Sequence, residues 1–223
     1  MRAVIFDMDG VIADTNPYHS EAFKQFFDKY HVPYTMAEFA DHMYGKHNSY
    51  IMKYFFKKDL SPEEIRSLEE EKERLFRKIY ALVAKPIDGL MPFIKELRQI
   101  GFKTAIATSA PKANLDLIVE KLDLRDKMDS LLSSEDVTKH KPDPEVYLNT
   151  ASALGVDPGQ CVVFEDSFSG VSAGLNAGMK VVGVLTSHNK EELPPCQLYI
   201  KDFREITAQD IERLLVKFNV NLQ

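Results

Sequence analysis

The amino-acid sequence predicts an α/β protein with a parallel sheet, helices on both faces of that sheet, and an all-helical insertion after the first strand. Short apolar runs alternate with helical patterns from about residue 86 to residue 185, which is typical of a parallel sheet covered on both faces. Residues 2–6 form one more apolar run, and residues 15–80 show helical patterns without a convincing strand. These observations indicate a Rossmann-like core that carries an inserted cap.

The first expected element is a buried strand at residues 2–6, which ends abruptly at Asp7. A helix follows, because apolar residues recur at helical spacing between Ala22 and Tyr30. Another aromatic-rich helix is expected near residues 51–56. A further helix begins at the sequence Ser-Pro-Glu-Glu of residues 61–64, which forms a capping box with proline at its first helical position.

After this block, strands and helices alternate. The expected strands are residues 103–108, 128–132, 161–164 and 180–185. The expected helices are residues 93–100, 115–122, 143–155 and a glycine-bearing segment around 170–178. Because the helical block interrupts this alternating core after its first strand, we predict a core domain of residues 1–14 and 81–223 and a cap domain of residues 15–80.

The composition argues against several classes of protein. Hydrophobic residues make up 44% of the 223 residues and charged residues 28%, and no apolar run reaches the length of a membrane span. The net charge of −6 disfavours nucleic acid as a partner, because binding it requires a basic face. The chain also starts without the pattern of a signal peptide. We therefore expect a cytoplasmic protein that binds neither nucleic acid nor a membrane.

Side chains that can do chemistry stand where the expected strands end. In an open parallel sheet, such positions line the crevice where ligands bind. The candidates are Asp7 and Asp9, Thr108 and Ser109, Glu165 and Asp166, together with Lys141, which comes just before the helix that begins near residue 144.

These residue types predict two adjoining sites. Carboxylates gathered at one edge repel one another unless a cation joins them, and their hard oxygen atoms suit magnesium. Thr108 and Ser109 precede the helix at residues 115–122, whose free amide groups and dipole favour an anion such as phosphate. Lys141 adds a positive charge to that anion site. We therefore expect Mg²⁺ beside a bound phosphate group.

Four segments carry a resemblance to a known family. They are Asp7-Met8-Asp9-Gly10-Val11, then Thr108, then Lys141-Pro142-Asp143-Pro144, and last Glu165-Asp166-Ser167 with Gly170. In this order they resemble the four motifs of the haloacid dehalogenase superfamily of phosphatases, and within it the β-phosphoglucomutase-like branch. The resemblance covers nearly the whole chain.

The resemblance implies a role for each motif residue. Asp7 would be the nucleophile that forms an aspartyl-phosphate, and Asp9 the general acid and base. Magnesium would be held by the carboxylates of Asp7 and Asp166, by the backbone carbonyl of Asp9, and by Glu165. Such a reaction fits the residues, because a carboxylate nucleophile divides phosphoryl transfer to water into two easier steps.

Lys72 is the first candidate for substrate binding in the cap. It lies four residues after Leu68 and three before Leu75, within the apolar stripe of its helix. In similar proteins a lysine of this helix faces the substrate. The alternative is a lysine at the edge of the stripe whose amine reaches solvent.

Three further cap residues are candidates by resemblance. His19 corresponds to a histidine near the domain hinge in the mutase-like branch, and a purely structural histidine is the alternative. Lys46 and His47 lie in a loop after Gly45 that resembles the position of the family's substrate-specificity loop.

The function implied is a magnesium-dependent phosphatase, a monomer acting on a small phosphorylated metabolite such as a sugar phosphate. A β-phosphoglucomutase-type sugar phosphomutase is the alternative, and we favour the hydrolase because the arginine of the mutase pattern is not obvious after Gly45. Two other classes fit less well. A phosphoacceptor receiver domain carries its aspartate after a middle strand, and metal-free dehalogenation needs no second acid at Asp9.

Overall fold

The computed structural model describes residues 1–43 and 48–216, which form two compact units. One unit, here called the core, contains Met1–Asp14 and the chain from Ala84 onward. The other, here called the cap, is Thr15–Val83. The chain leaves and re-enters the core at neighbouring points, because Ala13 pairs with Pro86 and the Ile87 amide donates to the Ile12 carbonyl (3.0 Å).

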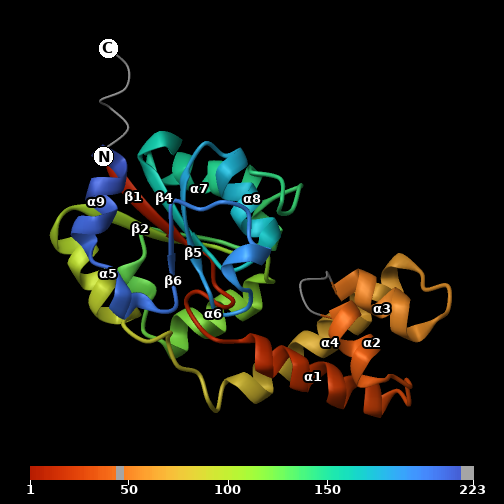
Figure 1. The fold of residues 1–223 in the computed structure, drawn as a ribbon. Coiled ribbons are helices and arrows are strands. Elements are labelled where there is room, and N and C mark those ends of the chain that lie inside the picture. The colour runs from red at the N-terminus through yellow and green to blue at the C-terminus, as the bar shows by residue number, and fades with distance from the viewer. Residues whose placement is uncertain (44–47, 217–223) are drawn as a thin grey trace. The chain divides into compact units, whose positions relative to one another are not determined.

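The core contains a six-stranded, all-parallel sheet in the order β3-β2-β1-β4-β5-β6 among the described residues. Figure 1 draws this sheet with the helices of the core around it. Its strands are β1 (Arg2–Phe6), β2 (Phe102–Ala107), β3 (Ser130–Leu132), β4 (Cys161–Glu165), β5 (Lys180–Val184) and β6 (Leu198–Ile200). The helices of this unit are α5 (Leu90–Gln99), α6 (Lys112–Lys121), α7 (Glu145–Leu154), α8 (Phe168–Asn176) and α9 (Ala208–Val216). The predicted fold class is confirmed.

The two central strands are buried on both faces, which explains why each is a continuous apolar run. On one face, Ile5 and Val163 pack in a cluster with residues of α7 and α8. On the other face, the rings of Phe6 and Phe164 stack with their centroids 5.3 Å apart and contact Phe93 of α5. The edge strand β6 and helix α9 were not among the elements predicted from the sequence.

The cap consists of α1 (Asn16–Lys29), α2 (Met36–Met43), α3 (Asn48–Phe56) and α4 (Pro62–Tyr80). Helix α4 packs against α1 and α3. Its start is the predicted capping box, in which the Glu64 amide donates to Ser61 Oγ and the Ser61 amide donates to Glu64 Oε2. Helix α2 is an addition to the predicted elements. The cap interior is mainly aromatic, with Phe23, Phe26, Phe27, Phe39 and Phe55 buried together.

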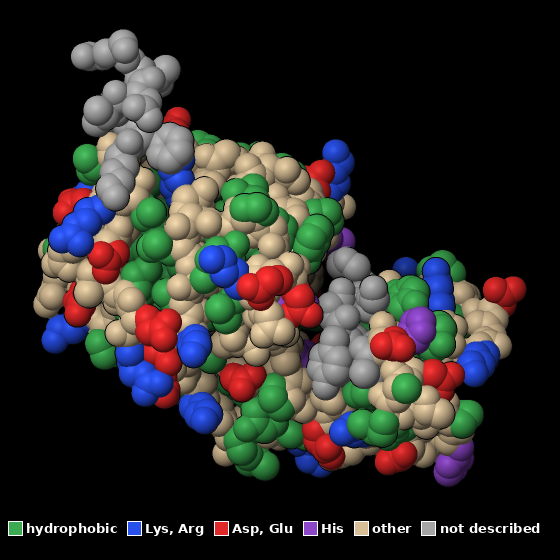
Figure 2. Space-filling view, viewed as in Figure 1, with side chains coloured by type: hydrophobic (Ala, Val, Ile, Leu, Met, Phe, Trp, Pro, Cys, Tyr) green, Lys and Arg blue, Asp and Glu red, His purple; other side chains and the backbone are tan. Residues whose placement is uncertain are grey.

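Within the described part of the chain, no helix combines the length and the apolar character needed to cross a membrane. Figure 2 shows acidic and basic side chains interspersed over the face in view, with apolar side chains between them.

Candidate active site

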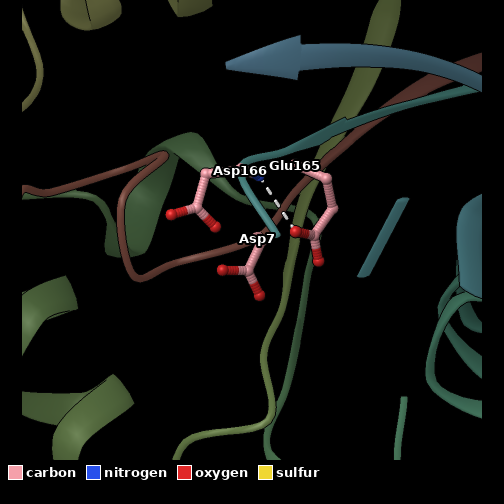
Figure 3. Close-up of side chains that lie close together, drawn as sticks. All are labelled: Asp7, Glu165 and Asp166. Atoms are coloured by element: carbon pink, nitrogen blue, oxygen red, sulfur yellow. Dashed lines mark hydrogen bonds between the residues drawn. The ribbon is translucent and has the colours of Figure 1, made fainter. Parts of the chain in front are cut away.

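The strand ends bring the predicted core residues to one edge of the sheet. Because β1 and β4 are adjacent and parallel, Asp7 after β1 lies beside Glu165 and Asp166 at the end of β4. The Asp7 amide donates to the Phe164 carbonyl (3.0 Å). One carboxylate oxygen from each of the three acids lies within 4.8 Å of the others, and all three side chains are buried (Figure 3).

Lys141 is the cation of this cluster. Its Nζ donates to Asp7 Oδ1 (2.6 Å), Glu165 Oε1 (2.7 Å) and the Ala107 carbonyl (3.2 Å). The amine also lies 4.7 Å from the ring centroid of Tyr147. Burial lowers the pKa of Lys141, but the charges of Asp7 and Glu165 outweigh that effect and raise it well above its usual value. Lys141 is therefore an ammonium ion held between two carboxylates.

Glu165 is surrounded by hydrogen-bond donors. Its Oε1 accepts from Lys141 and from the Tyr147 hydroxyl (2.8 Å). Its Oε2 accepts from the amides of Asp166 and Ser167 and from Ser167 Oγ, at 3.0 to 3.2 Å. A Cβ atom at Gly170 would overlap the carboxylate, so only glycine fits there. Both oxygens of Glu165 thus accept hydrogen bonds, and one of them helps to hold Lys141; metal binding by Glu165 stays a prediction.

The cluster contains three acidic groups and one ammonium group. Burial raises the pKa of Asp166 to about 8, and the charge of Glu165 adds to that effect. Burial also raises the pKa of Asp7, although Lys141 opposes the shift. Three buried carboxylates thus share one ammonium group, and their oxygens are hard ligands. The donor set fits Mg²⁺, whose positive charge would favour ionisation of these carboxyl groups.

Asp9 lies in the turn that follows β1. The Gly10 amide donates to the Ala13 carbonyl (2.8 Å), and Gly10 has a φ of 75°, a left-handed conformation that favours glycine. A Cβ atom at Gly10 would also overlap Oδ2 of Asp166. The charge of Asp9 contributes to the raised pKa values of Asp7 and Asp166, so its carboxylate lies near theirs.

The two predicted phosphate-binding residues after β2 differ in their surroundings. Thr108 is buried, and its Oγ1 accepts from the Ala110 amide (3.0 Å). Ser109 is exposed. Helix α6 begins after Pro111 without a side-chain cap on its first turn, although the Lys112 amide donates to Glu135 Oε1 (3.2 Å). Phosphate binding by Thr108 and Ser109 stays a prediction.

Lys72 is buried within the cap and does not reach solvent. Its Nζ donates to Glu73 Oε1 (2.7 Å), lies 2.9 Å from Nδ1 of His19, and stands 4.2 Å from the ring centroid of Phe23. The Asn48 side-chain amide donates to the same Glu73 oxygen (2.7 Å). The alternative considered for Lys72, a lysine at the edge of the apolar stripe whose amine reaches solvent, therefore does not describe this structure.

Two other cap predictions have different outcomes. The ring of His19 stacks on Phe76, with centroids 3.7 Å apart, so its position has a structural basis whatever its functional role. Lys46 and His47 lie outside the described residues. Substrate contact by any of these cap residues stays a prediction.

The sequence profile of the haloacid dehalogenase-like hydrolases matches residues 4–184. The chain belongs to this family. A phosphatase of phosphorylated carbohydrates from Thermotoga maritima is 36% identical to this hydrolase over 195 residues, which cover 85% of this chain and 88% of that protein.

Two solved structures share the fold. A family IA, variant 3 hydrolase from Entamoeba histolytica has a TM-score of 0.90 at 28% identity, covering 96% of this chain and 99% of that one. A β-phosphoglucomutase from Clostridium difficile has a TM-score of 0.86 at 24% identity, covering 99% and 100%, and at this identity it shows the fold alone. The resemblance inferred from the four motifs is confirmed, as is the expected class, a phosphoric monoester hydrolase of the haloacid dehalogenase superfamily.

Several residues around the site of this hydrolase were missed from the sequence. Tyr147 occupies an apolar position of α7 and is indistinguishable there from a packing residue. Thr186, Ser187 and His188 come directly after the expected strand at residues 180–185. The rule that strand ends carry functional side chains identified the other site residues, and applying it to this strand would have identified these three.

Proposed function

We propose that this enzyme is a magnesium-dependent phosphatase of a small sugar phosphate, and that the phosphoryl group passes through an aspartyl-phosphate at Asp7. The observation that carries the proposal is the buried cluster of Asp7, Glu165 and Asp166, in which three acidic groups gather beside the one ammonium group of Lys141. The name of the Thermotoga maritima relative, a phosphatase of phosphorylated carbohydrates, supports the choice of substrate class.

In the first step, a carboxylate oxygen of Asp7 attacks phosphorus while the bond from phosphorus to the leaving oxygen breaks. Asp9 donates a proton to that leaving oxygen. In the second step, Asp9 takes a proton from a water molecule, the water oxygen attacks phosphorus, and the bond to Asp7 breaks to release phosphate. The positioned proton transfer by Asp9 contributes about 10² to 10⁴ in rate.

The remaining core residues stabilise charge during both steps. Lys141 already donates a hydrogen bond to Asp7 Oδ1, so it lies where the phosphoryl oxygens gather. Asp7, Asp166 and the carbonyl of Asp9 would hold Mg²⁺. The bound ion would neutralise negative charge on the phosphoryl oxygens. Thr108 and Ser109 bind the same phosphoryl group in this proposal.

The cap selects the leaving group in this proposal, with His19, Lys46, His47 and Lys72 as its candidate contacts. Basic and acidic residues are equal in number over residues 15–80, so the net charge of −6 resides in the remainder. The ammonium of Lys72 is compensated by Glu73. A balanced cap suits an uncharged sugar better than a leaving group with a second phosphate.

A panel of phosphate esters tests the proposal by measuring released phosphate with Mg²⁺ and with excess chelator. We expect release from one or more sugar monophosphates, loss of that release on chelation, and loss in Asp7→Asn. The control is Asp126→Asn, which changes an exposed aspartate outside the site. Absence of release from every sugar phosphate, or full turnover in chelator, would overturn the proposal. A reaction on β-glucose 1-phosphate that requires its bisphosphate and releases no phosphate would indicate the mutase.

A further inference from the structure

The segment of residues 186–188 follows β5 and reaches the edge of the sheet that carries the site. Strand β5 pairs in parallel with β4, so its carboxyl end lies beside Glu165 and Asp166. The segment is Thr-Ser-His, and each of its side chains contacts a residue of the acidic cluster or of the turn after β1.

Thr186 holds the turn that carries Asp9. Its Oγ1 donates to the Gly10 carbonyl at 2.6 Å. Gly10 is the residue with the left-handed φ, and its carbonyl follows directly on Asp9 in the chain. The hydrogen bond from Thr186 to the Gly10 carbonyl therefore restrains the backbone of the turn. The carbonyl just before it, that of Asp9, is the one proposed to bind the cation.

Ser187 and His188 hold Asp166. Ser187 Oγ donates to Asp166 Oδ2, and His188 Nδ1 lies 2.9 Å from the Asp166 carbonyl. The same Oδ2 lies against Gly10, because a Cβ atom at that glycine would overlap it. One oxygen of the carboxylate is thus fixed between Ser187 and Gly10, which restricts how the side chain can rotate.

We propose that residues 186–188 form a positioning loop that orients Asp166 and the Asp9–Gly10 turn for binding of the divalent cation. The inference rests on the proposed function for the identity of that cation. Residues that hydrogen-bond to metal ligands fix the ligand geometry before the ion arrives, and their loss typically lowers metal affinity about 10- to 100-fold. None of the three side chains needs to touch substrate for this role.

The test measures the Mg²⁺ dissociation constant of the full chain by calorimetric titration, and the melting temperature without metal. The variants are Ser187→Ala and Thr186→Val, each of which removes a hydroxyl donor. Thr186→Ser keeps the hydroxyl and serves as the rescue. The matched control is Ser172→Ala on α8, which removes a hydroxyl that donates to the Phe168 carbonyl within its own helix.

We expect the dissociation constant to rise about tenfold or more in Ser187→Ala and Thr186→Val. It should stay near the wild-type value in Thr186→Ser and Ser172→Ala, and the metal-free melting temperature should change little in all four. An unchanged dissociation constant in both donor-removing variants would overturn the inference, even if the melting temperature fell, because the loop would then be structural only.

The outcomes separate this inference from the proposed function. A wild type that binds Mg²⁺ but hydrolyses no phosphate ester overturns the proposed function and leaves the loop to be judged by its variants. A wild type that hydrolyses sugar phosphates, with Mg²⁺ affinity unaffected by loss of either hydroxyl, overturns the positioning loop alone. A wild type that binds no Mg²⁺ overturns both.

Discussion

Two of the described lysines are buried, one in each unit, and their surroundings differ in charge. Lys141 in the core pairs with the carboxylates of Asp7 and Glu165, and Lys72 in the cap pairs with the carboxylate of Glu73. Each amine also stands over an aromatic ring, at 4.7 Å from the centroid for Lys141 and 4.2 Å for Lys72. Both sites thus hold a buried lysine beside an aromatic ring, but they differ in the acidic residues that pair with the lysine.

The difference indicates which cluster is built to receive a charged ligand. In the core, Asp166 is a third buried acid beside Asp7 and Glu165, and burial raises its pKa to about 8. A bound cation would favour the ionised form of this carboxyl group. In the cap, the ammonium of Lys72 is paired with the carboxylate of Glu73. The core cluster therefore suits binding of a cation, and the cap cluster suits recognition of uncharged groups.

The largest effect is expected for Asp7→Asn, which removes the proposed nucleophile. We expect kcat to fall about 10⁴-fold or more, since the amide of Asn cannot form the aspartyl-phosphate. The fold should persist, because the change also lowers the repulsion among three buried acids. The measurement is phosphate release with Mg²⁺, alongside the melting temperature and the Asp126→Asn control. A kcat within tenfold of wild type would contradict the role of the core cluster.

Replacing each buried lysine tests the comparison directly. Lys141→Met should lower kcat/KM about 10²- to 10³-fold for every ester, because it removes a preorganised charge beside the phosphoryl group. Lys72→Met should instead change the preference among sugar phosphates and leave a small aryl phosphate nearly unaffected. The measurement is kcat/KM for both variants on both kinds of ester. Equal losses of kcat/KM on both esters in Lys72→Met would contradict the proposal that the cap selects the leaving group while the core binds the phosphoryl group.

The metal-free protein should lose stability as pH rises from about 4 to about 8. Over this range folded Asp166 keeps its proton, with a pKa of about 8, whereas the unfolded chain releases it near pH 4. The folded state then binds more protons, so the free energy of unfolding falls by up to about 1.4 kcal/mol per pH unit for this group. Burial shifts the pKa of Asp7 in the same direction.

Mg²⁺ competes with these protons, so its stabilising shift of the melting temperature should be larger at pH 8 than at pH 5. Thermal unfolding at both pH values, with Mg²⁺ and with chelator, measures the difference. The balanced cap offers the control, since Glu73→Gln should leave this pH dependence in place. An equal Mg²⁺ shift at both pH values would show that the core carboxylates do not bind the ion.

The smallest effect is expected for Glu73→Gln, which unbalances the cap. The variant keeps a side-chain oxygen and removes the charge that compensates Lys72. We expect kcat/KM for sugar bisphosphates to rise about three- to tenfold relative to monophosphates, because loss of the Glu73 charge makes the surroundings of Lys72 more positive and so more favourable for a second phosphate. Glu70→Gln is the control, since Glu70 is exposed and pairs only loosely with Arg74 (3.8 Å). An unchanged ratio would mean that this charge plays no part in specificity.

Much of the core was predictable because its signals are local. Continuous apolar runs identify the central strands, and a strand end locates Asp7 and Asp166 without any tertiary information. The edge strand β6 has three residues, too few to show a period, and it was not predicted. The partner of Lys72 was equally hidden. Glu73 is the next residue of α4, and successive helical positions point in different directions, so their ion pair depends on packing with α1 and α3.

The position of β1 in the middle of the sheet has a consequence for synthesis. This strand is made well before its two neighbours, which begin only at residues 102 and 161. The cap, in contrast, is one continuous stretch of chain that carries helices α1 to α4, and it assembles from contacts within residues 15–83. On the ribosome, helices of the cap can pack while the apolar residues 3–6 still lack partners. That interval exposes an unpaired, strongly apolar strand, and it is the stage at which the nascent chain depends most on protection from aggregation.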